Sequence, residues 1–334
     1  MMPIMQFVGN LGYVAVSILG GYLVIRNAIQ VGDIQSFIQY VRQFTQPIQQ
    51  VAQVANMLQS TAAASERVFE FLDEEEEEQT VADPVPTDNL EGRVEFDHVH
   101  FGYNPDHIII NDFNAKVEPG QKIAIVGPTG AGKTTMVKLL MRFYDVNSGS
   151  IKIDGHDLRE FNRADLRSMF GMVLQDTWLF NGSIEENIRY GKLDATHEEV
   201  VEAAKAAYVH RFVQTLPGGY DMVLNEEASN VSQGQKQLLT IARAILADPK
   251  ILILDEATSS VDTRTEVRIQ KAMDNLMQGR TSFIIAHRLS TIRDADLILV
   301  MKDGDIIEQG SHEELLAKNG FYAELYNSQF EKSA

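Results

Sequence analysis

The nine residues from Gly127 to Thr135 constrain the fold of this chain more than any other stretch. They read Gly-Pro-Thr-Gly-Ala-Gly-Lys-Thr-Thr and follow the apolar run from Ile123 to Val126. The pattern G-x-x-x-x-G-K-[ST] predicts a buried strand, a glycine-rich turn and a helix that opens at about Gly132. Such a turn directs backbone N–H groups and the positive end of a helix dipole at one point. We therefore expect a nucleoside triphosphate, ATP or GTP, to bind at this loop.

Each part of the loop has an expected contact with the nucleotide. A Cβ at Gly127, Gly130 or Gly132 would crowd the phosphate oxygens or forbid the positive φ angles that such a loop uses. Lys133 brings a positive charge to the β and γ phosphates, and the hydroxyl of Thr134 is placed to ligate Mg²⁺. The expected nucleotide-binding residues of the loop are Gly127, Pro128, Thr129, Gly130, Ala131, Gly132, Lys133, Thr134 and Thr135.

The composition narrows the class of protein. A chain of 334 residues has room for about two domains, and its 44% hydrophobic content allows a buried core. The formal net charge of −18 argues against binding of nucleic acid by the whole chain, which needs clustered Lys and Arg. The chain has no cysteine, so disulfides and cysteine-ligated zinc are excluded, which fits a reducing compartment.

The N-terminal stretch is apolar from Pro3 to Ile25 and carries no charge before Arg26. About 20 apolar residues in a helix cross the ~30 Å hydrocarbon core of a bilayer. We therefore expect a membrane helix over about 3–26. A signal peptide and a buried helix of a soluble protein are the alternatives, and the lack of a basic n-region disfavours the first.

A second helix is predicted over 33–72, with an apolar stripe at spacings of three and four and an opposite face rich in glutamine. We expect the polar face to line a watery cavity or to contact other helices; a long soluble helix is the alternative. Residues 1–72 are thus predicted to form a partial transmembrane domain. Residues 73–92, with an acidic run and two prolines, are predicted to be a solvated, flexible linker, and residues 93–330 a nucleotide-binding domain.

Residues beyond 93 alternate between strand and helix patterns, which predicts an α/β fold with a largely parallel sheet. The apolar strand Ile251–Leu254 ends in Asp255 and Glu256. An Asp at this place in phosphate-loop NTPases helps to hold Mg²⁺, and Glu256 is then free to activate the attacking water. Ser232 is expected to cap a helix that runs to Ala247, and this helix start is a second potential phosphate site.

The complete set of motifs resembles an ATP-binding cassette (ABC). The residues that carry the resemblance are Tyr103, Gly127–Thr135, Gln175, Val231–Gln235, Asp255, Glu256, Asp262 and His287. The resemblance implies a P-loop NTPase of ABC type, with a mostly parallel sheet core, an antiparallel β subdomain and a helical subdomain. It also implies a head-to-tail dimer, in which each signature closes over the nucleotide of the other cassette.

The resemblance further assigns roles to single residues. Tyr103 is implied to stack on adenine, although by itself it fits a turn equally well, and Gln175 is implied to reach Mg²⁺ and the attacking water. His287 is implied to hold the γ-phosphate, and Asp262 to lie at the dimer seam. The signature residues Ser232, Gly234 and Gln235 are implied to contact the nucleotide of the partner, with Ser232 and Gly234 facing phosphate. The signature is usually Leu-Ser-Gly-Gly-Gln, and here Val231 and Gln233 replace its first and third residues.

The first 72 residues resemble the last two of the six membrane helices of a bacterial multidrug or lipid exporter half-transporter. The resemblance implies an N-terminally truncated half-transporter that uses ATP and Mg²⁺, with Glu256, His287, Gln175 and Lys133 as catalytic residues. Its expected partners are a second half-transporter, identical or different, a membrane and a small-molecule or lipid-like substrate. The expected location is the plasma membrane, multi-pass, with a cytoplasmic cassette.

Two other readings remain open. One is a membrane-tethered nucleotide-binding module, remnant or regulatory, without its own transport pathway. The other is an ATPase of DNA repair or chromosome structure, which the acidic composition and the apolar N-terminus disfavour.

Overall fold

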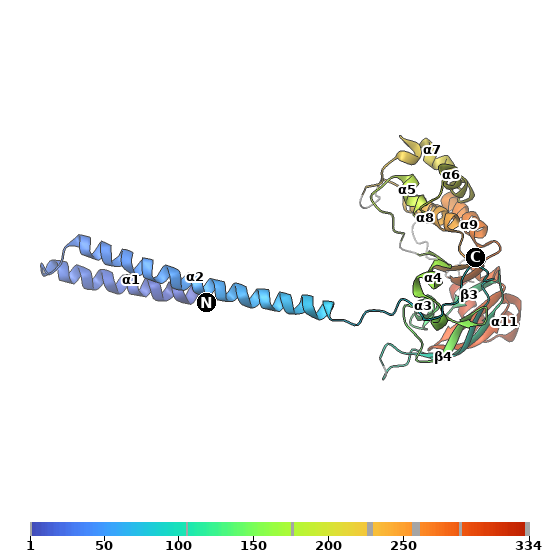
Figure 1. Cartoon of the computed structure of the whole chain (residues 1–334), viewed down its shortest axis with the longest axis horizontal. Coiled ribbons are helices and arrows are strands. Elements are labelled where there is room, and N and C mark those ends of the chain that lie inside the picture. Colours follow the sequence, from blue (N-terminus) through green and yellow to red (C-terminus); the bar gives the residue numbers. More distant parts are fainter. Residues whose placement is uncertain are drawn as a thin grey trace. The chain divides into compact units, whose positions relative to one another are not determined.

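The structure is a computed structural model that describes residues 2–104, 106–174, 177–225, 230–255, 261–286 and 289–330. The chain divides into two compact units, Met1–Glu77 and Glu78–Ala334 (Figure 1). The first unit contains two long helices, and the second contains two sheets with the remaining helices.

The first unit is a hairpin of α1 (Met2–Ile25) and α2 (Val31–Leu72), which lie side by side (Figure 1). The turn between them ends in a cap, because the backbone N–H of Gln30 donates to the carboxylate of Asp33 at 2.8 Å. Gly20 is buried where the helices approach closely; a Cβ there would lie 2.8 Å from Cγ1 of Ile34. A small residue at this point therefore lets the two helices pack.

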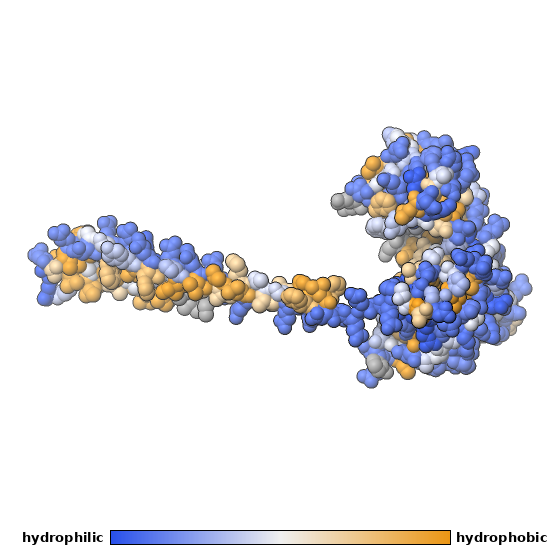
Figure 2. All heavy atoms as spheres, viewed as in Figure 1, coloured by the Kyte–Doolittle hydropathy of each residue, from blue (hydrophilic) through white to orange (hydrophobic). Residues whose placement is uncertain are grey.

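Among the described residues, one helical stretch is long and apolar enough to cross a membrane, Gln6–Ile25 of α1. Almost none of this stretch is buried by the rest of the described chain, unlike the core helix of a soluble protein. The face of the hairpin visible in Figure 2 is largely hydrophobic along α1 and mixed along α2. Both long helices of the expected fold class are thus present, but only α1 has the composition of a membrane span.

The larger sheet of the second unit has the strand order β10-β9-β3-β8-β7-β6. Its strands are β3 (Lys122–Val126), β6 (Phe170–Val173), β7 (Ile251–Asp255), β8 (Thr281–Ile285), β9 (Leu297–Lys302) and β10 (Asp305–Gly310). All neighbours pair in parallel except β10 with β9. Their carboxyl ends therefore meet along one edge of the sheet, where α/β proteins bind ligands.

Both faces of this sheet are buried, which explains the continuous apolar runs of its strands. In β3, Ala124 and Val126 point into one core and Ile123 and Ile125 into the other. The first core contains side chains of α8 (Gln233–Ala247) and α9 (Thr263–Met277). The second core contains side chains of a smaller antiparallel sheet of order β2-β1-β4-β5. The strands of that sheet are β1 (Val94–Phe101), β2 (Ile110–Val117), β4 (Ser148–Ile153) and β5 (His156–Asp157).

Ten helices belong to the described parts of the second unit, with two short 3₁₀ turns at Leu158–Glu160 and Gly219–Asp221. They are α3 (Lys133–Leu140), α4 (Arg163–Ser168), α5 (Ile184–Arg189), α6 (His197–Ala206), α7 (His210–Thr215), α8 (Gln233–Ala247), α9 (Thr263–Met277), α10 (Leu289–Arg293), α11 (His312–Lys318) and α12 (Phe321–Phe330). Helices α5 to α9 gather in one lobe of this unit (Figure 1). The second unit thus has the fold class expected from the motifs. It combines a P-loop core, an antiparallel β subdomain and a helical subdomain.

Part of the predicted linker after α2 is bound to the second unit. From Glu78 onward it is hydrogen-bonded to the region around α4: the side chain of Arg163 donates to the carbonyl of Glu78 at 2.8 Å, and the backbone N–H of Val81 donates to Asn162 Oδ1 at 3.0 Å. The compact second unit accordingly begins at Glu78, whereas the acidic run before it belongs to the first unit.

Candidate nucleotide site

The phosphate loop joins β3 to α3 and is held in place by β9 and β2. Gly127 and Gly132 have φ angles of +154° and +101°, which L side chains rarely adopt. A Cβ at Gly127 would also collide with the carbonyl oxygen of Met301, and one at Gly132 would lie 2.8 Å from Cδ1 of Ile110. These two glycines are therefore required by the packing under the loop as well as by its conformation.

Lys133 is the first residue of α3, and its side chain points back into the loop. Its ammonium group donates to the carbonyl oxygens of Gly127 at 2.7 Å and Pro128 at 3.0 Å. Burial lowers the pKa of Lys133, while the nearby negative charge of Asp255 acts in the opposite direction. The loop thus holds a half-buried cation beside a carboxylate at the edge where the strands end.

The neighbouring strands end at the same edge of the sheet. One of them ends in Asp255, an expected Mg²⁺ ligand, and three strands are followed in the sequence by expected catalytic residues. Asp255, the last residue of β7, pairs with Ile285 of β8, which in turn pairs with Ile125 of β3. Gln175, Glu256 and His287 follow β6, β7 and β8 in the sequence, but all three lie outside the described residues. The side chain of Thr134 is exposed in the first turn of α3.

Tyr103 is anchored to α3, the helix that follows the loop. Its hydroxyl lies 3.4 Å from Oγ1 of Thr135, and the ammonium of Lys138 lies 5.5 Å from the centre of its ring. The ring of Tyr144 meets that of Tyr103 edge to face at 5.0 Å. Because Tyr103 remains 41% exposed, it is accessible for stacking. The sequence interpretation missed Lys138 and Tyr144, since neither lies in a recognisable motif.

The signature residues gather around the start of α8 and α9. The hydroxyl of Ser232 accepts a hydrogen bond from the backbone N–H of Gln235 at 3.3 Å, and the side chain of Gln235 accepts one from the N–H of Ser232 at 2.8 Å. Asp262 caps α9 by accepting from the N–H of Thr265 at 3.0 Å, and hydrogen bonds from the side chain and then the backbone of Thr265 lower the pKa of Asp262. Ser232 therefore caps α8, as expected, and the side chain of Gln235 is engaged in the same cap.

Gly234 has a structural role that the sequence pattern does not reveal. It is buried, and a Cβ there would lie 2.5 Å from Cγ2 of Thr265 and 2.9 Å from Cγ1 of Val261. Its missing side chain thus allows α8 to pack on α9. The expected contact of Gly234 with phosphate would be made by its backbone, and it stays a prediction.

The expected site residues accordingly form two groups. Tyr103, the phosphate loop and Asp255 belong to one group; Ser232, Gly234, Gln235 and Asp262 belong to the other, on the helical lobe that contains α8 and α9 (Figure 1). The donor set of the first group fits Mg²⁺, which is typically held by a hydroxyl or carboxylate together with phosphate oxygens. Among the described residues, no cluster of three or more His, Cys, Asp or Glu could hold a metal.

Comparison with known proteins agrees with this arrangement. The profile of the "ABC transporter" family matches residues 110–259, which include the phosphate loop and the signature. This chain carries an ABC transporter domain. Over 97% of its length it is 58% identical to a fatty acid ABC transporter ATP-binding/permease protein of Mycobacterium bovis, of which it covers 51%.

Further relatives are also ABC exporters. Over 99% of its length the chain is 41% identical to an ATP-dependent lipid A-core flippase of Syntrophus aciditrophicus, of which it covers 55%. The structure resembles that of a bacterial Atm1-family ABC exporter with ATP bound, with a TM-score of 0.70, 38% identity and coverage of 98% of this chain and 57% of that chain. The chain thus spans about half the length of the curated relatives it matches. It carries an ABC exporter cassette preceded by part of a membrane region.

Proposed function

We propose that this chain is the ATP-hydrolysing part of an exporter that moves an amphiphilic substrate across a membrane. Two cassettes would close head to tail over ATP, each presenting its signature to the phosphate loop of the other. The observation that carries the proposal concerns Lys133. Among the described residues, its half-buried ammonium donates to uncharged backbone carbonyls of the loop, those of Gly127 and Pro128. Phosphate oxygens are stronger acceptors for this cation, so binding of ATP would replace these bonds.

The remaining roles rest on the resemblance of the motifs to those of ATP-binding cassettes. The side chains of Thr134 and Asp255 would hold Mg²⁺, which neutralises charge on the phosphates. Glu256 would activate the attacking water, Gln175 would orient it, and His287 would stabilise the γ-phosphate. Tyr103 would stack on adenine. Ser232, Gly234, Gln235 and Asp262 would face the nucleotide held by the partner.

The separation of the two groups supports a dimer. The signature caps α8 in the helical lobe, apart from α3 of the same chain (Figure 1). A second cassette, identical or different, would bring a signature to this phosphate loop. Closure would persist only while the γ-phosphate bridges the two faces, so hydrolysis would release it.

The membrane part and the substrate class rest on α1 and on the relatives. Gln6–Ile25 has the composition of a membrane span, and the cassette must lie on the side where ATP is found. We place the cassette in the cytoplasm and the hairpin in the plasma membrane. The relatives include a fatty acid transporter and a lipid A-core flippase, which favours a lipid-like amphiphile.

ATP binding and hydrolysis test the proposal in the purified chain reconstituted in lipid nanodiscs. Lys133→Ala should weaken ATP binding about 10- to 100-fold, because a charge-assisted hydrogen bond is worth ~1.5–3 kcal/mol. Glu256→Gln should retain ATP binding, slow turnover by about 10²- to 10⁴-fold and accumulate an ATP-dependent dimer in mass photometry. Lys205→Ala is the control, because Lys205 only pairs with Glu202 on the surface of α6. Normal turnover by Glu256→Gln would remove Glu256 from its role.

A further inference from the structure

Lys138 of α3 lies over the aromatic ring of Tyr103, and no motif of the sequence includes this lysine. Its ammonium is 5.5 Å from the centre of the ring, within the ~6 Å over which a cation is attracted to the face of an aromatic ring. Lys138 is half-buried, and among the described residues no carboxylate forms an ion pair with it. The contact of this cation is thus an aromatic face rather than a counter-ion.

The ring of Tyr103 is held by α3 and by the segment that follows α3. Lys138 lies three residues after Thr135, so both side chains are on the same face of the helix. Oγ1 of Thr135 lies 3.4 Å from the phenol oxygen, which is long for a hydrogen bond between hydroxyls. The ring of Tyr144 meets that of Tyr103 at 5.0 Å and an angle of 79°. Because the hydroxyl contact is weak, the orientation of the ring depends on Lys138 and Tyr144.

The backbone next to Tyr103 is fixed to the same segment after α3. The N–H of Gly102 donates to Asn147 Oδ1 at 2.7 Å, and the N–H of Asn147 donates to the carbonyl of His100 at 3.0 Å. A Cβ at Gly102 would collide with the carbonyl oxygen of His107, so the backbone is tightly packed here. With the backbone held, the remaining freedom of Tyr103 is rotation of its side chain, which Lys138 restricts.

One short helix connects the two ends of the proposed nucleotide site. Lys133, expected at the phosphates, is the first residue of α3, and Lys138 follows five residues later, a rise of about 7.5 Å. The ring of Tyr103 is therefore kept at a fixed distance from the phosphate loop. A ring that is held in advance need not be ordered when a base stacks on it, and this preorganisation favours binding.

We infer that Lys138 is a positioning residue for the base of the nucleotide, which it holds through Tyr103. The cation occupies one face of the ring, and the base stacks on the opposite face. The inference rests on the nucleotide binding in the proposed function, to which it adds a residue that selects nucleotides with a stacking base over a free polyphosphate.

Binding of the non-hydrolysable ATP analogue AMP-PNP and of inorganic tripolyphosphate to the purified chain in nanodiscs, measured by isothermal titration calorimetry, tests the inference. Lys138→Met removes the charge and should weaken AMP-PNP binding about 2- to 5-fold, the range expected for one cation–π contact at a partly exposed site. Tripolyphosphate binding should be unchanged, because this ligand has no base. An equal loss for both ligands would mean that Lys138 contacts phosphate, and tighter AMP-PNP binding would mean that Lys138 blocks the stacking face. Either result would overturn the inference.

Two further variants identify the ring as the group through which Lys138 acts. In the Tyr103→Ala background, Lys138→Met should cause no additional loss of AMP-PNP affinity, because the ring is already absent. Lys138→Arg keeps a cation over the ring, so binding should stay within about twofold of the unmodified chain. Additive losses in the double variant, or a loss in Lys138→Arg as large as that in Lys138→Met, would contradict the proposed role.

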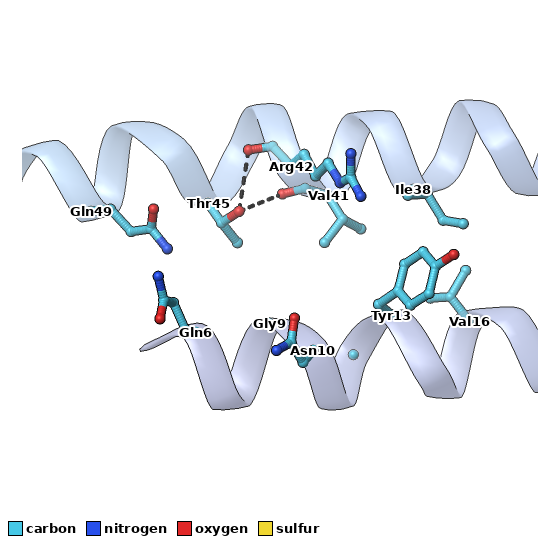
Figure 3. Close-up of a pocket in the computed structure, with 11 residues that line it drawn as sticks. Gln6, Gly9, Asn10, Tyr13, Val16, Ile38, Val41, Arg42, Thr45 and Gln49 are labelled. Atoms are coloured by element: carbon cyan, nitrogen blue, oxygen red, sulfur yellow. Dashed lines mark hydrogen bonds between the residues drawn. The ribbon is translucent and has the colours of Figure 1, made fainter. Parts of the chain in front are cut away.

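Two cations of the hairpin supply the controls. Cζ of Arg26 lies 5.0 Å from the centre of the Tyr22 ring, so Arg26→Met removes a similar contact outside the cassette. Arg42 on α2 lines a cavity of about 350 Å³ between the two helices of the hairpin (Figure 3). Arg26→Met and Arg42→Met should bind both ligands as the unmodified chain does. If either control lost as much AMP-PNP affinity as Lys138→Met does, the effect would not be specific to Lys138 and the inference would be wrong.

ATP hydrolysis, measured on the same samples, separates this inference from the proposed function. Hydrolysis by the unmodified chain together with AMP-PNP binding that does not depend on Lys138 would overturn the inference alone. A complete lack of hydrolysis together with Lys138-dependent AMP-PNP binding would overturn the proposed ATPase function and leave the role of Lys138 standing.

Discussion

The side-chain amide of Gln233 donates a hydrogen bond to the hydroxyl of Thr177, with 3.2 Å between the two atoms. Gln233 stands where the usual signature of ABC proteins has a glycine, which has no side chain to make this bond. Thr177 lies two residues after Gln175, which is proposed to orient the attacking water. The substitution therefore ties the start of α8 to the segment that follows β6.

This bond predicts a functional coupling between the signature and the segment carrying Gln175. Gln233→Ala and Thr177→Val should each lower kcat for ATP about 2- to 10-fold, because a net hydrogen bond is worth ~0.5–1.5 kcal/mol. The double variant should be no slower than the slower single variant, since both remove one interaction. The kcat values of the unmodified chain, the two single variants and the double variant, measured by steady-state ATP hydrolysis, form a double-mutant cycle.

Gln270 supplies the matched control for the cycle. Its side-chain amide also donates at 3.2 Å, to Asp274 on the exposed face of α9. Gln270→Ala should leave kcat unchanged. Fully additive effects of Gln233→Ala and Thr177→Val would show that the bond carries no coupling.

The contacts of Tyr103 predict that its ring matters more than its hydroxyl. Tyr103→Ala should weaken ATP binding about 5- to 150-fold, the range expected for loss of base–aromatic stacking worth ~1–3 kcal/mol. Tyr103→Phe should bind within about threefold of the unmodified chain, because it loses only the long 3.4 Å contact with Thr135. Titration with a fluorescent ATP analogue measures both affinities. Equal losses in the two variants would argue against stacking.

The motifs predicted the nucleotide-binding core correctly because its local structure depends on residues that are close together in the sequence. A phosphate loop requires a strand, a turn and a helix, and the structure has β3 and α3 around Gly127–Gly132. Ser232 was likewise predicted as the cap of a helix ending at Ala247, and α8 has these bounds. Helix capping depends on two residues that are three positions apart, so it can be predicted from the local sequence alone.

Features that depend on distant segments could not be predicted in this way. The contact between Gln233 and Thr177 joins residues 56 apart, and the clash that requires Gly234 comes from α9. The strands β9 and β10 have no catalytic motif, although Met301 of β9 supports the phosphate loop. Tertiary packing, which a single sequence does not display, determines all three.

The packing of Gly234 predicts a destabilised variant with a specific rescue. Gly234→Ala places a Cβ 2.5 Å from Cγ2 of Thr265, so the free energy of unfolding should fall by about 1–3 kcal/mol. Thr265→Ser removes that methyl group while its backbone N–H can still donate to Asp262. The double variant Gly234→Ala, Thr265→Ser should therefore recover part of the loss in urea unfolding. Failure of the serine to restore any stability would mean that Val261, at 2.9 Å, is the main obstacle.

Tyr220 predicts a stability that declines at alkaline pH. Its hydroxyl lies 2.7 Å from Nδ1 of His210, and burial raises its pKa from 10.0 to about 12. The folded chain therefore holds the phenol proton more tightly than the unfolded chain does. Unfolding releases this proton between about pH 10 and pH 12, so rising pH favours unfolding in that window. The contribution of the hydroxyl is fully present below pH 10 and is lost above it.

Tyr220→Phe isolates this contribution. At pH 8 the variant should unfold at a lower urea concentration than the unmodified chain, because it lacks the bond to His210. The difference between the two midpoints should stay constant up to about pH 10 and then shrink as the pH is raised from 10 to 12, whereas the general loss of stability from other groups affects both proteins equally. Tyr208→Phe, at an exposed tyrosine, is the control and should show no such pH-dependent difference. A midpoint difference for Tyr220→Phe that stays constant over this range would mean that the hydroxyl does not titrate there.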